Sequence, residues 1–145
     1  MKRLLVIANR LPFSTTKRMG QFHFRASPGG LAVGLSSLPE SIERFWIGWP
    51  GIADEKLATE DKELIREKLA SENCMPVFLS KKQIERYYLG FCNKTIWPLF
   101  HYFPTRTTWE NRFWQAYKQV NLAFCKEVIK IVRPGDNIWV HDYQL

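Results

Sequence analysis

Two adjacent glycines stand where a helix is expected to begin. In the stretch ASPGGLAVGL, residues 26–35, Ser27 and Pro28 are typical of a helix start, and Gly29 and Gly30 follow them directly. Glycines at a helix entrance leave the backbone N–H groups approachable, and the helix dipole adds partial positive charge there. Such a site would hold a phosphate or a sugar oxygen. SPGGL matches neither of the common phosphate-loop patterns, so an ordinary tight turn is the alternative.

A basic and an acidic residue are predicted at one edge of a sheet. Arg10 follows the apolar run LLVIAN, residues 4–9, and Asp142 closes the run NIWVHD, residues 137–142. Open α/β folds keep their sites at the carboxyl edge of the sheet. Arg10 could hold a phosphate there with two parallel hydrogen bonds, although a surface arginine is the alternative. Asp142 could bind hydroxyl groups or act as a base, while His141 should face the other side of the strand as a core or supporting histidine.

Large aromatic residues concentrate in two stretches, WIGWPG at residues 46–51 and YYLGFCNKTIWPLFH at residues 87–101. For any single ring, burial in the core is the simpler interpretation. As a group the rings also fit a sugar-binding cleft, because indole and phenol combine an apolar face with a hydrogen-bonding group. His23 and His101 lack the spacing of metal ligands, and the three cysteines are scattered, so no metal site is predicted.

Short apolar runs bounded by turn residues predict the strands that would position these side chains. The strands are expected at residues 4–9, 44–51, 75–79 and 137–142. The first run is apolar without alternation, which is typical of a strand buried on both faces of a parallel sheet. A loop rich in Ser, Thr, Lys and Arg is expected to follow it.

Helical patterns fill the intervals between these strands. One helix is expected from Gly29, a second over residues 59–73 and a third after Ser80. A capping box of Thr107 and Glu110 is expected to start a long last helix. The apolar face of that helix would comprise Phe113, Tyr117, Val120, Phe124, Val128 and Ile131. Strands that alternate with helices predict an α/β fold with a Rossmann-like parallel sheet.

The composition describes one globular domain with a basic surplus. The chain has 145 residues, 46% of them hydrophobic, and a formal net charge of +7. The surplus suits an anionic partner, but the dispersed basic residues argue against nucleic acid. No apolar run approaches the roughly 18 residues of a membrane span, and the apolar start is interpreted as a strand rather than a signal peptide. Scattered cysteines favour reduced thiols and a cytoplasmic location.

Six stretches resemble, in the same order, the N-terminal part of the trehalose-6-phosphate synthases. They are ANRLP, SPGGLAVGL, WIGWPG, YYLGFCNKTIWPLFH, YKQVNLAF and IWVHDYQL, and they span nearly the whole chain. The resemblance implies a retaining glycosyltransferase with two Rossmann-like domains, the GT-B type. Residues 1–145 would then be the N-terminal, acceptor-side domain, incomplete, without the C-terminal nucleotide-sugar domain. The chain also stops just after the last predicted strand, at "HDYQL", so a truncation is expected.

The same resemblance implies the reaction and the residues that support it. Glucose would move from UDP-glucose to glucose 6-phosphate with retention, and the leaving phosphate would take the acceptor's proton. The protein would contribute orientation and charge stabilisation, without a nucleophile. The residues implied as substrate ligands are Arg10 for the acceptor phosphate, Gly29 and Gly30 for the donor, Tyr88 and Asp142 for the acceptor, and Trp97 and Trp49 for the acceptor pocket. Asp142 is also the catalytic candidate, and Trp46 is the alternative to Trp49.

The resemblance implies no metal and no cofactor other than the donor substrate, UDP-glucose. Partners are expected to be these two small molecules, with neither nucleic acid nor membrane, and homo-oligomerisation is left open. The family's catalytic histidine and its diphosphate-binding Arg and Lys fall beyond residue 145, so the chain alone is expected to be inactive. The alternatives are a related transferase with another acceptor, such as glucosylglycerol-phosphate synthase, a non-catalytic synthase-like subunit, and a basic nucleic-acid binder.

Overall fold

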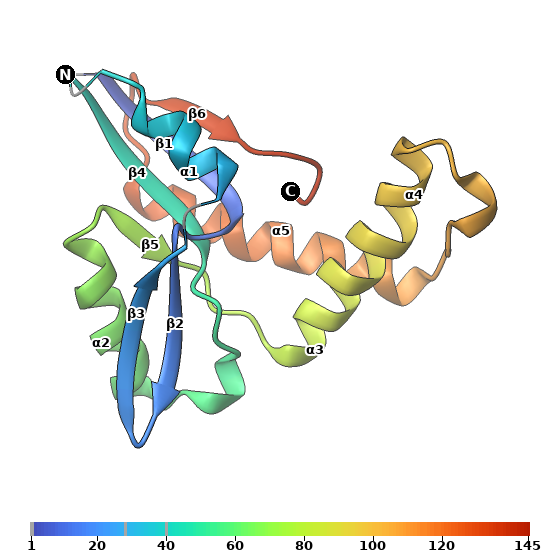
Figure 1. Ribbon diagram of the computed structural model, residues 1–145, viewed down its shortest axis with the longest axis horizontal. Helices are drawn as coiled ribbons and strands as arrows, with labels where there is room; N and C mark the ends of the chain where they lie inside the picture. Colours follow the sequence, from blue (N-terminus) through green and yellow to red (C-terminus); the bar gives the residue numbers. More distant parts are fainter. Residues whose placement is uncertain (1, 28, 40) are drawn as a thin grey trace.

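A computed structural model describes residues 2–27, 29–39 and 41–145 (Figure 1). The expected helix-start residue Pro28 lies outside the described residues. A sheet occupies one end of the molecule in Figure 1, and a helical arm occupies the other, with the long helix α5 (Asn111–Ile131) joining them. No helix in the described ranges is long and apolar enough to cross a bilayer.

The sheet is parallel, as predicted, and its strands run in the order β5-β4-β1-β6. The strands are β1 (Lys2–Arg10), β4 (Ile42–Trp49), β5 (Cys74–Pro76) and β6 (Asn137–Val140). β1 is central, and its residues Leu5 and Val6 are fully buried, which fits a strand covered on both faces. β5 ends earlier than expected at Pro76, and β6 ends before Asp142, whose φ is +65°. Both strands are therefore shorter than the apolar runs that predicted them.

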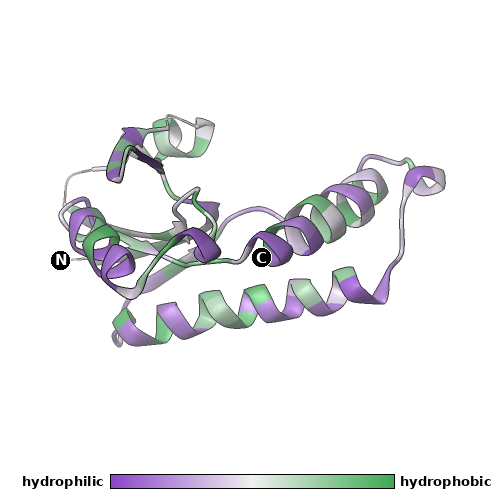
Figure 2. Ribbon diagram, turned by 90° about the horizontal axis from the view of Figure 1, so that it is seen from below, coloured by the Kyte–Doolittle hydropathy of each residue, from purple (hydrophilic) through white to green (hydrophobic). Residues whose placement is uncertain are grey.

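Two apolar clusters cover the sheet. In the first, Ile7 of β1 and Ile47 of β4 pack with Val120 and Phe124 of α5. In the second, residues of α2 (Thr59–Ala70) pack with Leu11, which follows β1. Figure 2 shows α5 as one long helix beneath the sheet, with hydrophobic and hydrophilic residues alternating along it. The predicted amphipathic pattern of this helix is confirmed, because Phe113, Val120, Phe124 and Val128 are all buried.

The prediction of a loop after the first strand is wrong, because the chain forms a β-hairpin there. β2 (Phe13–Arg18) and β3 (Gln21–Ala26) pair antiparallel across a turn at Met19 and Gly20, both with positive φ. Two tight-turn residues with positive φ suit the right-handed twist of a hairpin. The basic side chains hid the alternation, in which Phe22 and Phe24 pack against the second apolar cluster. The short helix α1 (Gly30–Ser36) follows the hairpin.

The third helix is longer and less regular than predicted. Ser80 caps α3 (Lys81–Ile84): its hydroxyl accepts a hydrogen bond from the N–H of Gln83 at 3.1 Å. The chain continues into a π-helical segment, η2 (Glu85–Ile96), and then into α4 (Trp97–Phe100). Single-turn π-bulges are the usual form of this geometry, so a segment of 12 residues is unusually long. It belongs to the helical arm of Figure 1.

Two short 3₁₀ turns complete the chain, η1 (Asp54–Lys56) and η3 (Pro104–Arg106). The prediction of a capping box at Thr107 and Glu110 is wrong. Glu110 is itself the residue that precedes α5, and it makes no side-chain cap. The Thr107 hydroxyl instead donates to the carbonyl of Phe103, because the 3₁₀ turn directs it backwards along the chain.

Candidate functional site

A cleft of about 280 Å³ lies at the carboxyl edge of the sheet. It brings together the end of β1, the start of α1 and the segment that follows β6, as the shared edge of parallel strands predicts. Among the described lining residues none is acidic, and Arg10 and His141 are the ionisable ones. The polar and aromatic lining includes Asn9, Arg10, Ser27, Trp46, His141 and Gln144. The cleft therefore has the charge character of an anion site.

Gly29 and Gly30 line this cleft beside Arg10, as predicted. Gly29 precedes α1 with φ −83° and ψ 162°, so neither position needs a left-handed backbone. A Cβ added to either glycine would meet no atom within 4 Å, so packing does not require glycine here. The first N–H groups of a helix have no acceptor within the helix. The Gly29 N–H already donates to the carbonyl of Ser27 at 2.8 Å, so the N–H groups without an acceptor within the helix begin at Gly30.

Arg10 is exposed at the end of β1, and its guanidinium lies over an indole ring. The guanidinium carbon is 4.8 Å from the centre of the Trp49 ring, within the range of a cation–π contact. In the described part of the chain no carboxylate pairs with Arg10. A cation that is held in place without a counter-charge is available to an anionic ligand.

The structure distinguishes the two tryptophans of WIGWPG. Trp46 lines the cleft, and its indole nitrogen is buried with no hydrogen-bond partner among the described residues. Trp49 is only 8% exposed and does not line the cleft, and its indole N–H donates to the carbonyl of Ile52 at 3.0 Å. Successive residues of a strand point to opposite faces, so positions 46 and 49 lie on different sides of the sheet.

Asp142 lies in the segment after β6, next to the cleft. Its φ of +65° is a left-handed conformation, which Asp adopts more readily than most residues. One carboxylate oxygen accepts from the N–H of Tyr143 at 2.9 Å, and the other accepts from the Gln144 amide at 3.4 Å. The side chain is exposed, and each oxygen keeps a further lone pair for a ligand hydroxyl.

His141 lines the cleft, whereas the sequence interpretation expected it to face the other side of the strand as a core or supporting histidine. It is half-buried and lines the cleft together with Arg10, and its backbone N–H donates to the carbonyl of Ile7 at 2.8 Å. The alternation argument assumed a strand through Asp142, whereas β6 ends at Val140 and Asp142 has a positive φ. The signal that could have corrected the prediction is the end of the strand before Asp142, where φ is positive, and the residue types do not reveal it.

Tyr143 is a neighbour of both Tyr88 and Asp142. Tyr88 and Tyr143 are both partly buried against the first apolar cluster. The pKa of Tyr143 is raised, chiefly by burial and then by the negative charge of Asp142, with a smaller contribution from Tyr88. The preceding Tyr87 is fully buried, and its hydroxyl donates to the side chain of Asn9 at 3.3 Å. This contact links the π-helical segment to the end of β1.

Trp97 is not in the lining of the cleft. It begins α4, is 42% exposed and stacks on His101 with ring centres 4.0 Å apart. The helical arm nevertheless reaches the segment after β6, because Phe100 meets Tyr143 edge to face at 6.1 Å. Trp97 therefore stands on an element that borders the Asp142 segment.

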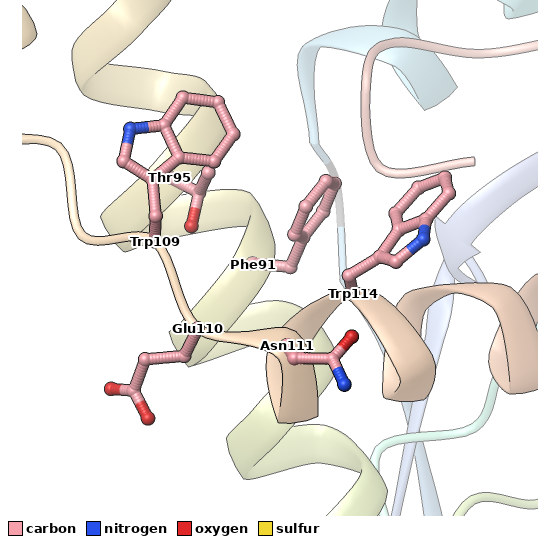
Figure 3. A pocket seen from close by; sticks show the side chains of 6 residues that line it. All are labelled: Phe91, Thr95, Trp109, Glu110, Asn111 and Trp114. Carbon is pink, nitrogen blue, oxygen red and sulfur yellow. The ribbon is translucent and has the colours of Figure 1, made fainter.

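A second hollow, of about 450 Å³, lies between the helical arm and the start of α5 (Figure 3). In Figure 3 the Phe91 ring lies between the two indoles, while the Glu110 carboxylate points away from them. Phe91 and Trp114 are in contact, with ring centres 5.5 Å apart. The hollow is lined by Phe91, Thr95, Trp109, Glu110, Asn111 and Trp114. It shares no lining residue with the cleft at the sheet edge.

Among the described residues, no group of three or more His, Cys, Asp or Glu side chains is close enough to hold a metal ion. The cysteines Cys74, Cys92 and Cys125 are free thiols, and the first two are buried.

Curated relatives of the chain are trehalose-phosphate synthases. The UDP-forming α,α-trehalose-phosphate synthase 1 of Aspergillus niger is 45% identical over 146 residues, which cover 99% of this chain and 28% of the relative. A solved α,α-trehalose-phosphate synthase (UDP-forming) from Burkholderia vietnamiensis superposes with a TM-score of 0.72 at 29% identity, covering 99% of this chain and 29% of that chain. Both are much longer than the part that matches.

A third comparison is with a ligand complex. The α,α-trehalose-phosphate synthase (UDP-forming) from Burkholderia xenovorans, solved in complex with glucose 6-phosphate, superposes with a TM-score of 0.66 at 26% identity, covering 98% of this chain and 28% of that chain. These structural neighbours have the GT-B fold, of which the match covers the N-terminal part. The model of the family described as glycosyltransferase family 20 matches residues 2–145. This chain, with its parallel sheet and its cleft at the carboxyl edge, therefore belongs to glycosyltransferase family 20.

Proposed function

We propose that the chain is the acceptor-side part of a UDP-forming α,α-trehalose-phosphate synthase. The observation that supports this most directly is the cleft in which Arg10, Gly29 and Gly30 meet without any acidic residue in the described lining. The relatives named above carry this activity in their names, and one of them holds glucose 6-phosphate. The chain spans about 28% of their length, so the second, nucleotide-sugar domain is proposed from the family.

In the proposed reaction, glucose moves from UDP-glucose to glucose 6-phosphate with retention. The bond between the glucose C1 and the UDP oxygen breaks, a bond forms from C1 to the acceptor hydroxyl oxygen, and the hydroxyl proton goes to the leaving phosphate. Arg10 would bind the acceptor phosphate, and the backbone at Gly29 and Gly30 would face the donor. Such a site accelerates the reaction by orientation and charge stabilisation.

Asp142 and Tyr88 would hold the acceptor sugar. We propose that the Asp142 carboxylate accepts a hydrogen bond from an acceptor hydroxyl and orients it, since its exposed oxygens retain free lone pairs. Trp97 would border the acceptor pocket from the helical arm. Trp46, rather than Trp49, would line it on the sheet side, because Trp46 is a cleft residue with an unpaired indole N–H.

The remaining proposals concern what accompanies the reaction. We propose that transfer needs no metal or cofactor beyond the donor substrate and that the protein works in the cytoplasm, where free thiols such as the buried Cys74 and Cys92 stay reduced. The chain alone would bind acceptor without turning over, because the diphosphate ligands of the family lie in the other domain.

Acceptor binding to this chain tests the proposal. Titration with glucose 6-phosphate, followed by NMR chemical shifts, should perturb cleft residues, whereas glucose should bind at least about tenfold more weakly because it lacks the charged group. Arg10→Met should remove this preference. Arg18→Met is the matched control, since Arg18 is exposed in the hairpin and does not line the cleft. Equal binding of glucose and glucose 6-phosphate, or equal effects of the two arginine variants, would refute the proposed phosphate site.

A further inference from the structure

The ring of Trp49 forms a flat support beneath the guanidinium of Arg10. The guanidinium carbon lies 4.8 Å from the ring centre, and Trp49 as a residue is only 8% exposed. A planar guanidinium stacks on an aromatic face more effectively than an ammonium group does. The indole is therefore a surface against which the exposed guanidinium of Arg10 packs.

Trp49 is itself held firmly. Its indole N–H donates to the carbonyl of Ile52 at 3.0 Å, and its own carbonyl accepts from the N–H of Leu11 at 3.1 Å. Its ring packs in the first apolar cluster. With the only donor of the indole already occupied, Trp49 has no hydrogen-bonding group left for a sugar. This favours a role beneath Arg10 over a role as a ligand.

The backbone brings Arg10 onto this ring through a close approach of two strands. Arg10 is the register partner of Trp49, after an irregularity in the pairing of β1 with β4 that follows Ile7. A Cβ on Gly48 would lie 2.7 Å from backbone atoms of both Arg10 and Leu11, closer than real Cβ contacts allow. Glycine at position 48 is thus what lets the end of β1 lie against β4.

We propose that Trp49 is a positioning residue: it holds the Arg10 guanidinium at the cleft so that the cation meets an acceptor phosphate already oriented. This inference rests on the proposed function of Arg10. An exposed arginine otherwise samples many rotamers, which binding would have to restrict. A ring beneath it reduces that entropy loss, and no carboxylate among the described residues competes for the cation.

The test compares Trp49→Phe with Trp49→Leu. Both variants lose the indole N–H and its hydrogen bond, but only phenylalanine keeps an aromatic face. In the ligand-free chain, the Arg10 side-chain N–H proton should be shifted by the ring current in the wild type and in Trp49→Phe, and should move to the unstacked position in Trp49→Leu. Nuclear Overhauser contacts between Arg10 and the Trp49 ring in the wild type provide a measurement that needs no variant.

Affinity provides the second measurement. With glucose 6-phosphate as the probe, Trp49→Leu should bind about three- to tenfold more weakly than the wild type, and Trp49→Phe should recover most of the loss. Circular dichroism of each variant verifies that it is folded. If wild-type binding is found but the two variants bind equally, or if the wild type shows no contact between Arg10 and Trp49, the positioning role is refuted. If the stacking is found but glucose 6-phosphate does not bind, the proposed function of Arg10 is what fails.

Discussion

Replacement of Gly90 by alanine should destabilise the protein by overpacking one buried contact. Gly90 lies in η2, and the ring of Phe113 in α5 lies directly against it. An added Cβ would be 2.6, 2.8 and 2.9 Å from three ring carbons of Phe113. Carbon atoms in contact normally lie about 3.5–4.0 Å apart, so either the ring or the helix must move.

The expected cost follows from two opposing effects. Overpacking a dense core costs about 1–3 kcal/mol, and Phe113 is only 7% exposed, so its ring has little room to shift. Alanine in place of glycine regains at most about 1 kcal/mol of helix propensity. The net loss should be about 1–2 kcal/mol, which lowers the Tm of a chain of this size by about 2–8 °C.

Thermal unfolding followed by circular dichroism measures this loss. Gly34→Ala is the matched control, because it also lies in a helix but an added Cβ there meets no atom within 4 Å. It should leave the Tm unchanged or raise it. In a Phe113→Leu background, the smaller side chain should reduce the cost of Gly90→Ala, so the two changes should be non-additive. A Gly90→Ala protein as stable as Gly34→Ala would show that the helix–helix contact is looser than described.

Three further changes probe the sheet edge and the buried ionisable groups. Gly48→Ala forces a Cβ against the backbone of Arg10. It should lower the free energy of unfolding in urea by about 3 kcal/mol and weaken glucose 6-phosphate binding. Unchanged binding would contradict the close approach of the two strands. Burial, followed by the charge of Asp142, raises the pKa of Cys92 from about 9 to about 12. The protonated thiol is favoured in the fold, so its contribution to stability is complete below pH 9 and is lost as the pH rises towards 12. When the pH is raised from 8 to 10.5, the urea concentration at the unfolding midpoint should therefore decrease less for Cys92→Ala than for the wild type. Arg3→Met removes the partner 3.1 Å from Asp136, whose side chain is only 4% exposed, and should cost about 3 kcal/mol in urea unfolding, part of which Asp136→Asn in the same chain should restore.

The parallel sheet could be predicted because burial on both faces leaves a direct trace in the sequence. The central strand β1 is apolar at consecutive positions, and Leu5 and Val6 are fully buried. The long helix α5 left an equally direct trace, since one apolar face recurs at helical spacing over 21 residues. Both patterns depend on burial alone, which the residue types report.

The hairpin and the π-helical segment could not be predicted in the same way. In the hairpin, Phe22 and Phe24 alternate with the polar residues Gln21, His23 and Arg25, so the stretch has the composition of a polar loop. The segment from Glu85 to Ile96 has π geometry and packs against α5, which is distant in the sequence. A long-range contact of this kind has no local signature.

The candidate site shows the same division. The edge on which Arg10 and the glycine pair meet follows from strand direction, which the sequence indicates. Trp46 lines the cleft and Trp49 packs beneath Arg10. This difference depends on the strand register, because successive side chains of a strand point to opposite faces of the sheet. The sequence interpretation placed an aromatic motif at this edge but could not say which of its two rings lines the cleft.

The glycines separate folding constraints from candidate binding positions. Gly48 and Gly90 are required by packing, since a Cβ on either would lie within 3.0 Å of neighbouring atoms. Gly29 and Gly30 have open space in front of them and an ordinary backbone, so folding gives no reason for glycine at either position. A side chain at either position would extend into open space beside the cleft that both residues line. The Gly29 N–H already donates to the carbonyl of Ser27 at 2.8 Å, so the proposed donor contact depends on the backbone at Gly30 and on the open space at both positions. If that proposal holds, a larger side chain at either position should narrow the cleft and weaken binding there, without lowering the stability of the fold.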